Sequence, residues 1–330
     1  MNTEPILETD LFARALSIVE TNLSLQPGET LLIVTDEPTR PIGRLFYEAA
    51  EAVAAQRNWT VLLVVMPEGK INGEEPPQPV AAAMAAADVA LCATQKSLTH
   101  TSARINAAAQ GTRVVTMPGI TLDMLRDGAA CANYAEVEQR TLNLTQRLDA
   151  AQTARIEKDG HVLTLDLSGR PGVPSPGVYR TPGACGNFPS GEAYIAPLET
   201  AANGTMIIDG SMVGIGKLTA PMTVTLESGQ LVNVEGEDEN GLYADQLEVL
   251  FRRPENATIA ELGIGTNERA LLCGIILEDE KLYGTVHIAF GTNTSFGGVT
   301  KADCHYDGII LKPTLYLDDE LIIDQGEFVI

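Results

Sequence analysis

Two of the four histidines lie near the C-terminus, close to an aspartate. His305 and Asp307 are two residues apart in CHYDG, and His287 lies earlier in the apolar segment VHIAF. On a strand, residues two apart point to the same face, so His305 and Asp307 would lie side by side. His287 is predicted to lie on a strand, facing a protected interior. Two imidazoles and a carboxylate suffice to bind a divalent transition metal. A histidine on a strand is more commonly a satisfied core residue, and the spacing by itself leaves that interpretation open.

Two glutamates have sequence surroundings typical of buried ligands. Glu192 lies in SGEAYIAP and Glu261 lies in IAELGIG, both within apolar segments that contain glycine. A buried carboxylate is costly unless it is paired or binds a metal. By contrast, the acidic run at residues 235–239 is typical of a solvated loop. Glu192 and Glu261 are therefore added to the candidate metal ligands.

The other two histidines have simpler surroundings. His161 follows the turn sequence KDG and is predicted to lie at the surface. His100, in LTHTSAR, precedes a predicted helix, where it could simply belong to the capping region. The alternative is a catalytic proton shuttle, because the usual pKa of histidine lies near neutral pH.

The ligands must be positioned by the second of two predicted domains, residues 1–157 and 158–330. In the first domain, apolar runs alternate with helical segments, which predicts a mainly parallel sheet with helices on its faces. The predicted strands are residues 30–35, 60–66, 89–94 and 113–117. The predicted helices are residues 11–23, with Asp10 as its cap, and residues 41–56, 80–87, 102–110 and 135–154. The motifs GxGxxG and GxxxxGK[ST] are absent from the sequence, so the usual dinucleotide and nucleoside-triphosphate sites are not indicated.

The second domain is rich in strand-like segments that follow a Pro/Gly-rich connection. This pattern predicts an α+β domain with a largely antiparallel, barrel-like sheet. The predicted strands are residues 161–169, 205–209, 222–227, 230–235, 272–277, 286–290, 309–317 and 320–323, and one helix is predicted at residues 241–252.

Composition limits the classes of partner. The 330 residues carry a formal net charge of −22, with a pI of about 4.5. Nucleic acids and anionic membranes attract clustered Lys and Arg, so this charge argues against both as partners. It is compatible with cationic ligands and metal ions, although solubility is the simpler explanation.

Cysteine usage and hydropathy predict a cytoplasmic protein. The five cysteines are odd in number, far apart and without a CxxC motif, which disfavours a disulfide framework or a zinc knuckle. The N-terminal MNTEPILETDLF lacks the apolar core of a secretory signal. Moreover, no apolar run approaches the roughly 20 residues that span a bilayer.

Several segments resemble the metal-dependent aminopeptidases of the aminopeptidase T type. The resemblance rests on NFPSGEAYIAPLETAANGTMIIDGS, IAELGIGTNERA, LEDEKLYGTVHIAFG and CHYDGIIL and, more loosely, on LQPGETLLIVTDEPTRPIGRLFYEAA. It implies an α/β domain followed by a domain that holds the site, usually in a homodimer. It also implies a site of two zinc, cobalt or manganese ions that hydrolyses peptides. The implied metal ligands are Glu192, Glu261, His287, His305 and Asp307.

Two departures point to a second family. The aminopeptidases have a catalytic tyrosine where this chain has Thr294, and the spacing from His287 to His305 is shorter here. The loop GTNTSFGG and the segment GGVTKADCHYDG are more similar to 2,5-dihydroxypyridine dioxygenases, which hold one ferrous ion and open a pyridine ring. This resemblance assigns His305 and Asp307 as ligands and His100 as the catalytic histidine. Those enzymes carry a histidine at the position of Glu261 and lack an equivalent of Glu192.

The sequence thus predicts a metalloenzyme that acts on a small peptide or another small molecule. The ligand set favours a metallo-aminopeptidase-like hydrolase, in which a metal-bound water attacks the peptide bond. The alternative is a mononuclear Fe(II) ring-cleaving dioxygenase with His100 as acid or base, and a metal-binding protein without activity is a third hypothesis.

Overall fold

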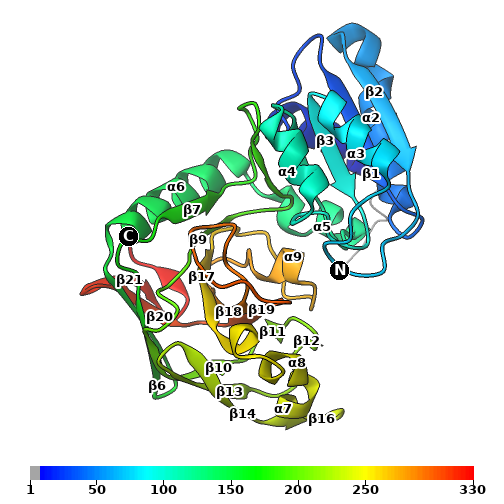
Figure 1. Ribbon diagram of the computed structural model, residues 1–330. Helices are drawn as coiled ribbons and strands as arrows, with labels where there is room; N and C mark the ends of the chain where they lie inside the picture. The colour runs from blue at the N-terminus through cyan, green and yellow to red at the C-terminus, as the bar shows by residue number, and fades with distance from the viewer. Residues whose placement is uncertain (1–7) are drawn as a thin grey trace, which may run out of the picture. The chain divides into compact units, whose positions relative to one another are not determined.

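The computed structural model describes residues 8–330, which form two compact units (Figure 1). The first unit contains the chain up to Tyr134 together with Gly177–Ser190, and the second contains Ala135–Pro176 and Gly191–Ile330. The chain therefore passes between the units three times, rather than once after residue 157. Most of the N-terminal segment examined for a secretory signal lies outside the described residues.

The first unit contains a five-stranded parallel sheet. Its strand order is β2-β1-β3-β4-β8. The bounds are β1 Thr30–Thr35, β2 Thr60–Val65, β3 Val89–Ala93, β4 Arg113–Thr116 and β8 Cys185–Asn187. The first four strands match the apolar runs of the sequence, which confirms the α/β class. The fifth strand comes from the returning segment 177–190, which had no strand signal.

Helices cover both faces of this sheet (Figure 1). On one face, an apolar cluster joins α3 (Gln78–Ala86) and α4 (Ser102–Ala109) to side chains such as Leu32 and Cys92. On the other face, Gly43 of α2 (Arg40–Arg57) lies so close to Thr35 of β1 that an added Cβ would be 2.7 Å from the Cβ of Thr35. Alternate residues of β1 therefore face different helices, as a buried parallel strand requires.

The N-terminal helix differs from its prediction. The structure has α1 (Glu8–Ser17) followed by a π-helical turn at Ile18–Asn22, instead of one helix over residues 11–23. Asp10 lies inside α1, so its assignment as the cap was wrong. Two short elements, α5 (Leu122–Arg126) and a 3₁₀ turn at Ala129–Cys131, were not predicted because each is too short to show a periodic pattern.

The second unit contains two antiparallel sheets and a two-stranded ribbon. The eight-stranded sheet has the order β14-β13-β10-β6-β5-β20-β21-β22, and the seven-stranded sheet has the order β12-β11-β19-β18-β17-β9-β7. The eight-stranded sheet consists of β5 Thr153–Lys158, β6 His161–Asp166, β10 Ala202–Ile208, β13 Met222–Glu227, β14 Gln230–Glu235, β20 Thr314–Leu317, β21 Glu320–Asp324 and β22 Glu327–Phe328. The seven-stranded sheet consists of β7 Gly172–Ser175, β9 Glu192–Ile195, β11 Ser211–Met212, β12 Gly216–Lys217, β17 Ile259–Gly265, β18 Val286–Gly291 and β19 His305–Ile310. The ribbon pairs β15 (Glu237–Asp238) with β16 (Gly241–Leu242).

One apolar core is shared by the two sheets. It includes Met206 and Val224 from the larger sheet and Leu262, Ile288 and Ile310 from the smaller one. The long helix α6 (Tyr134–Ala150) contributes further apolar side chains to the same core. This arrangement confirms the α+β class with largely antiparallel sheets.

Three elements of the second unit were predicted wrongly. Residues 272–277 form no strand, because Asp279 accepts the backbone N–H groups of Cys273 (2.7 Å) and Gly274 (2.9 Å) and α9 (Ile276–Asp279) follows. The predicted strand 309–317 is broken between β19 and β20, where Lys312 has a positive φ of 47° and Pro313 lacks a donor.

The third wrong element is the helix predicted at residues 241–252. The chain forms β16 and then two short helices, α7 (Tyr243–Gln246) and α8 (Glu248–Phe251). Leu247, with φ −101° and ψ 22°, separates the two helices. A 3₁₀ turn at Pro254–Ala257 then leads into β17. The strands β9 and β17 were not predicted, although both carry candidate ligands.

No helix within residues 8–330 is both long and apolar enough to cross a lipid bilayer.

The first sheet offers a matched pair of leucines to test its packing. Leu32 of β1 and Leu62 of β2 are register partners, but Leu32 is 1% exposed and Leu62 is 48% exposed. We expect Leu32→Ala to lower the free energy of unfolding by about 2–5 kcal/mol, because it leaves a cavity between strand and helix. Leu62→Ala should change it by less than about 1 kcal/mol. Urea unfolding followed by circular dichroism measures both, and equal losses would contradict this packing.

Candidate metal centre

One face of the smaller sheet collects the candidate ligands. Residues paired across adjacent strands share a face, and residues two apart along a strand do so as well. Glu261 on β17 pairs with Ala289, which pairs with Asp307 on β19. Glu192 on β9 pairs with Gly265 on β17, and His305 pairs with Gly291. The ligands therefore alternate with the apolar residues that face the core.

Small residues on this face make room for the ligands. Gly263 pairs with His287, and a Cβ added to Gly263 would lie 1.9 Å from Nε2 of that imidazole. Ala289 separates Glu261 from Asp307, and Gly291 lies beside His305. The Gly and Ala residues of IAELGIG and HIAFG thus act as spacers, which explains why polar ligands fit within apolar sequence.

The imidazole of His305 is oriented by a backbone carbonyl. Its Nδ1 lies 2.8 Å from the carbonyl oxygen of Thr292, to which it can only donate. Its Nε2 lies 3.3 Å from a carboxylate oxygen of Glu261 and 3.3 Å from one of Asp307. Metal-binding histidines commonly donate their second N–H to such a carbonyl. His305 is therefore arranged to present Nε2 together with two carboxylates.

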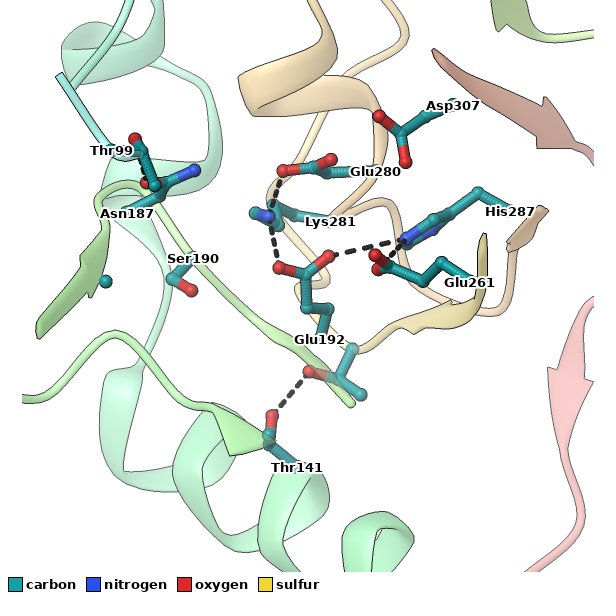
Figure 2. Close-up of polar contacts among 12 residues, drawn as sticks. Thr99, Thr141, Asn187, Ser190, Glu192, Glu261, Glu280, Lys281, His287 and Asp307 are labelled. Carbon is teal, nitrogen blue, oxygen red and sulfur yellow. Dashed lines mark hydrogen bonds and ion pairs between the residues drawn. The ribbon is translucent and has the colours of Figure 1, made fainter. Parts of the chain in front are cut away.

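His287 and Glu192 form the second part of the site, with a buried lysine (Figure 2). His287 Nε2 lies 3.4 Å from Glu261 and 3.6 Å from Glu192. The ammonium of Lys281, which is fully buried, lies 2.5 Å from the other oxygen of Glu192 and also contacts Glu280. Among the described residues, Glu192 Oε2 and His287 Nδ1 have no hydrogen-bond partner.

The structure brings all five predicted ligands together and adds a sixth group. Three sets could each hold a metal ion, with ligand atoms within 4.8 Å of one another. These sets are Glu192, Glu261 and His287; Glu261, His305 and Asp307; and Glu280, His287 and Asp307. We call these six residues the ligand cluster.

The buried carboxylates of the ligand cluster favour positive charge on the groups beside them. Burial by itself would raise the pKa of Glu261, but contacts with His287 and His305 lower it to about 2. Burial would lower the pKa of His287, yet Glu261 and Glu192 raise it to about 9. The pKa of His305 is raised well above its usual value against the same burial effect, chiefly by Asp307 and Glu261. Burial and the other carboxylates raise the pKa of Glu280 to about 8, against the opposing charge of Lys281. Without a metal, the buried carboxylates hold protons on both imidazoles.

Sequence reasoning missed Glu280 and Lys281. They lie in EDEK, which has the appearance of a solvated charge run, yet Glu278, Asp279 and Lys281 are at most 1% exposed. Glu278 accepts the backbone N–H of Leu271 at 3.0 Å, so part of this charge fixes the preceding loop. The available signal was the position of EDEK inside a segment that resembles the aminopeptidases.

The loop between β18 and β19 places an aromatic ring beside the site. Phe296 meets the imidazole of His305 edge-on, with ring centroids 6.0 Å apart, and it meets Tyr194 at 5.3 Å. Asn293 anchors the loop through two hydrogen bonds. Its Oδ1 accepts the N–H of Thr300 at 2.8 Å, and its Nδ2 donates to the carboxylate of Glu199 at 3.0 Å. Thr294, where the aminopeptidases have their tyrosine, is exposed in this loop.

His100 belongs to the first unit. It is exposed in the turn between β3 and α4, and the next residue, Thr101, caps α4 by accepting the N–H of Arg104. The turn lies at the carboxyl end of β3, beside the reversal of strand order between β1 and β3. Ligands commonly bind at such a point in open parallel sheets.

The comparisons with known proteins decide between the two families. Residues 9–330 match the model of the 2,5-dihydroxypyridine 5,6-dioxygenase (NicX) family. The chain belongs to this dioxygenase family. A 2,5-dihydroxypyridine 5,6-dioxygenase of Pseudomonas putida KT2440 is 27% identical over 210 residues, which span 58% of each protein. The aligned part thus covers less than two thirds of that relative.

Two solved structures share the fold. The 2,5-dihydroxypyridine dioxygenase of Pseudomonas putida KT2440 superposes with a TM-score of 0.82 at 20% identity and covers 98% of each chain. AmpT from Thermus thermophilus gives a TM-score of 0.72 at 15% identity, over 98% of this chain and all of the other. At these identities the likeness establishes the aminopeptidase-like fold.

The expected hydrolase function was wrong. The dioxygenase family match extends over nearly the whole chain, so the protein belongs with the dioxygenases rather than with the metallo-aminopeptidases that remove N-terminal residues. The resemblance to the aminopeptidases reflects the shared fold, which does not by itself determine the reaction.

Gly263 provides a test of the packing around His287. We expect Gly263→Ala to lower the affinity for a divalent ion by roughly 10–100-fold, because the new methyl group occupies the place of the His287 imidazole and displaces it. Equilibrium dialysis with Mn²⁺ measures the affinity, and circular dichroism checks the fold. Gly69→Ala is the control, since its Cβ would meet no atom closer than 3.4 Å. Unchanged affinity in Gly263→Ala would contradict the role given to this glycine.

Proposed function

We propose that the protein is a mononuclear non-haem Fe(II) dioxygenase that opens a hydroxylated pyridine or a closely related aromatic ring. The family match carries this proposal. It is supported by a set of Glu261, His305 and Asp307, whose ligand atoms lie within 4.8 Å of one another. The Pseudomonas putida relative is named for 2,5-dihydroxypyridine, so that compound is the first substrate to test.

The donor chemistry of this set fits ferrous iron. Imidazole and carboxylate are the ligands of the iron sites in non-haem oxygenases, which usually have two histidines and one carboxylate. Here the set has one histidine and two carboxylates, because Glu261 stands where the resemblance places a histidine. His287 lies 3.4 Å from Glu261 and is the second imidazole of the ligand cluster. The two carboxylates match the charge of one divalent ion.

The residues of the second unit would hold and orient the reactants. Ferrous iron supplies the redox chemistry that lets molecular oxygen react with an aromatic ring. The hydrogen bond from His305 Nδ1 to Thr292 fixes one ligand. Phe296 and Tyr194 offer an aromatic wall beside His305, and aromatic rings pack favourably edge-on or offset. This wall suits a planar ring substrate.

His100 is proposed as the proton donor or acceptor for the hydroxylated ring. The support is its resemblance to the catalytic histidine of the dioxygenases and its exposed position at the carboxyl end of β3. Ring opening by a dioxygenase places both oxygen atoms in the product and needs no external reductant, but hydroxyl protons must move. An exposed imidazole can donate or accept such a proton. The homodimer and the cytoplasmic location remain predictions.

Oxygen uptake tests the proposed reaction. Protein loaded anaerobically with Fe²⁺ should consume about one O₂ per 2,5-dihydroxypyridine, as a dioxygenase requires, while the ring absorbance disappears. An oxygen electrode and ultraviolet spectroscopy measure the two quantities. If the iron-loaded protein consumes no oxygen with dihydroxypyridines or other dihydroxylated aromatic rings, the proposal is wrong.

Two aspartate variants test the metal site, one inside it and one outside it as the control. Asp307→Asn should reduce both iron content and oxygen uptake at least about 10-fold, because it removes a ligand charge. Asp303→Asn should leave both unchanged, since Asp303 is exposed and pairs with Arg253 at 3.0 Å.

The role of His100 gives a separate prediction. We expect His100→Ala to retain full iron content and to lose about 10²–10⁴-fold in turnover, the range typical of a lost acid or base. His161→Ala is the control because His161 is half-buried on β6, hydrogen-bonded to Thr205 at 2.9 Å and outside the ligand cluster. Steady-state oxygen uptake and iron analysis measure the effects. Unchanged turnover in His100→Ala would mean that His100 has no catalytic role and only belongs to the turn that precedes α4.

A further inference from the structure

A fully buried ammonium lies inside the ligand cluster. Lys281 is 0% exposed, and its Nζ lies 2.5 Å from Glu192 Oε1 and contacts Glu280 (Figure 2). Lysine is almost never fully buried unless it is paired. The cost of removing an ammonium from water can exceed what a buried salt bridge returns, so a lysine placed so deeply calls for an explanation beyond stability.

The backbone around Lys281 is built to deliver the ammonium to this place. The segment after α9 passes directly over Gly265, where an added Cβ would lie 2.0 Å from the carbonyl oxygen of Leu282. The carbonyl of Lys281 accepts the N–H of Asn267 at 2.9 Å, and Gly284 donates to the carbonyl of Gly265 at 3.1 Å. Gly265 pairs with Glu192 in the sheet, so this close approach brings Lys281 to that carboxylate.

Lys281 contacts two of the three possible metal sets and not the third. Glu192 belongs to one of the three possible metal sets and Glu280 to another, and both carboxylates already contact the ammonium. Within residues 8–330, no lysine or arginine forms an ion pair with the remaining set, Glu261, His305 and Asp307. A divalent ion in either of the first two sets would compete with Lys281 for a ligand and meet its positive charge.

We propose that Lys281 takes the place of a second metal ion, and so restricts the centre to one divalent ion at Glu261, His305 and Asp307. This inference rests on the proposed function in that it explains a mononuclear centre. Six potential ligands would otherwise suffice for two ions, which bind about 3.5–4 Å apart in two-metal sites. The fixed ammonium contacts both Glu192 and Glu280 and supplies one positive charge to them, in a form that neither exchanges nor binds substrate as a Lewis acid.

Metal stoichiometry tests this role without any measurement of activity. The probe is Mn²⁺, with isothermal titration calorimetry and elemental analysis after desalting. The wild type should bind one ion, and Lys281→Met should bind two, because methionine keeps an unbranched apolar side chain without the ammonium and so releases both carboxylates. Electron paramagnetic resonance of the variant should then show a coupled Mn²⁺ pair. Two ions in the wild type, or one ion in Lys281→Met, would overturn the proposal.

Two further variants complete the experiment. Lys158→Met should still bind one ion, since Lys158 is also nearly buried (side chain 10% exposed) but pairs with Asp209 at 3.1 Å, outside the ligand cluster. The double variant Glu192→Gln, Lys281→Met should return to one ion, because the vacated place loses a carboxylate. Two ions bound by this double variant would contradict the assignment.

Folding of Lys281→Met is itself informative. If the variant is unfolded without metal, Mn²⁺ should restore the fold with two ions bound, since the second ion replaces the lost charge. Failure of Mn²⁺ to restore the fold, or restoration with one ion, would overturn the role of Lys281. A wild type that binds one ion but consumes no oxygen would instead refute the proposed function and leave this inference intact.

Discussion

Concentrated negative charge on one face of an otherwise apolar sheet is the constraint on which the second unit depends. Glu192, Glu261 and Asp307 are each at most 6% exposed, and Glu280 joins them from the segment before β18. Removing carboxylates from water is costly unless cations or donors replace the water. The raised pKa of both imidazoles and the buried position of Lys281 are two responses to this charge, and a divalent metal ion would be a third.

The sheet tolerates this charge because its two faces are kept separate. Period-2 alternation directs Leu262, Ile288 and Ile310 into the core and directs the ligands to the opposite side. Glycine at 263 and 265 then allows the imidazole of His287 and the backbone of Leu282 to approach the sheet. A side chain at either position would push the ligand cluster apart, so these glycines are part of the site although they bind nothing themselves.

One fold is shared by this chain, AmpT and a Pseudomonas putida dioxygenase. The likeness to both structures establishes the same arrangement of elements, and the family match assigns the chain to the dioxygenase family. Whether this site binds one metal ion or two depends on how many positive charges its carboxylates can compensate. The ammonium of Lys281 bears on that number directly, and Phe296 and Tyr194 give the neighbourhood of His305 an aromatic character.

The sequence by itself determined the class of both units and singled out five candidate ligands that the structure brings together, Glu192, Glu261, His287, His305 and Asp307. Apolar runs mark buried parallel strands, and a polar residue inside apolar, glycine-bearing sequence marks a buried ligand, so both signals are local. Nothing in the sequence indicates that EDEK is buried, because a run of charged residues has the same sequence whether it lies in solvent or packs beside the ligand cluster. The sequence pattern also misplaced the strand at residues 272–277, where the carboxylate of Asp279 takes the backbone donors. Only the tertiary structure brought Lys281 to Glu192, 89 positions earlier, because that contact requires β17 to carry glycine where another segment crosses it.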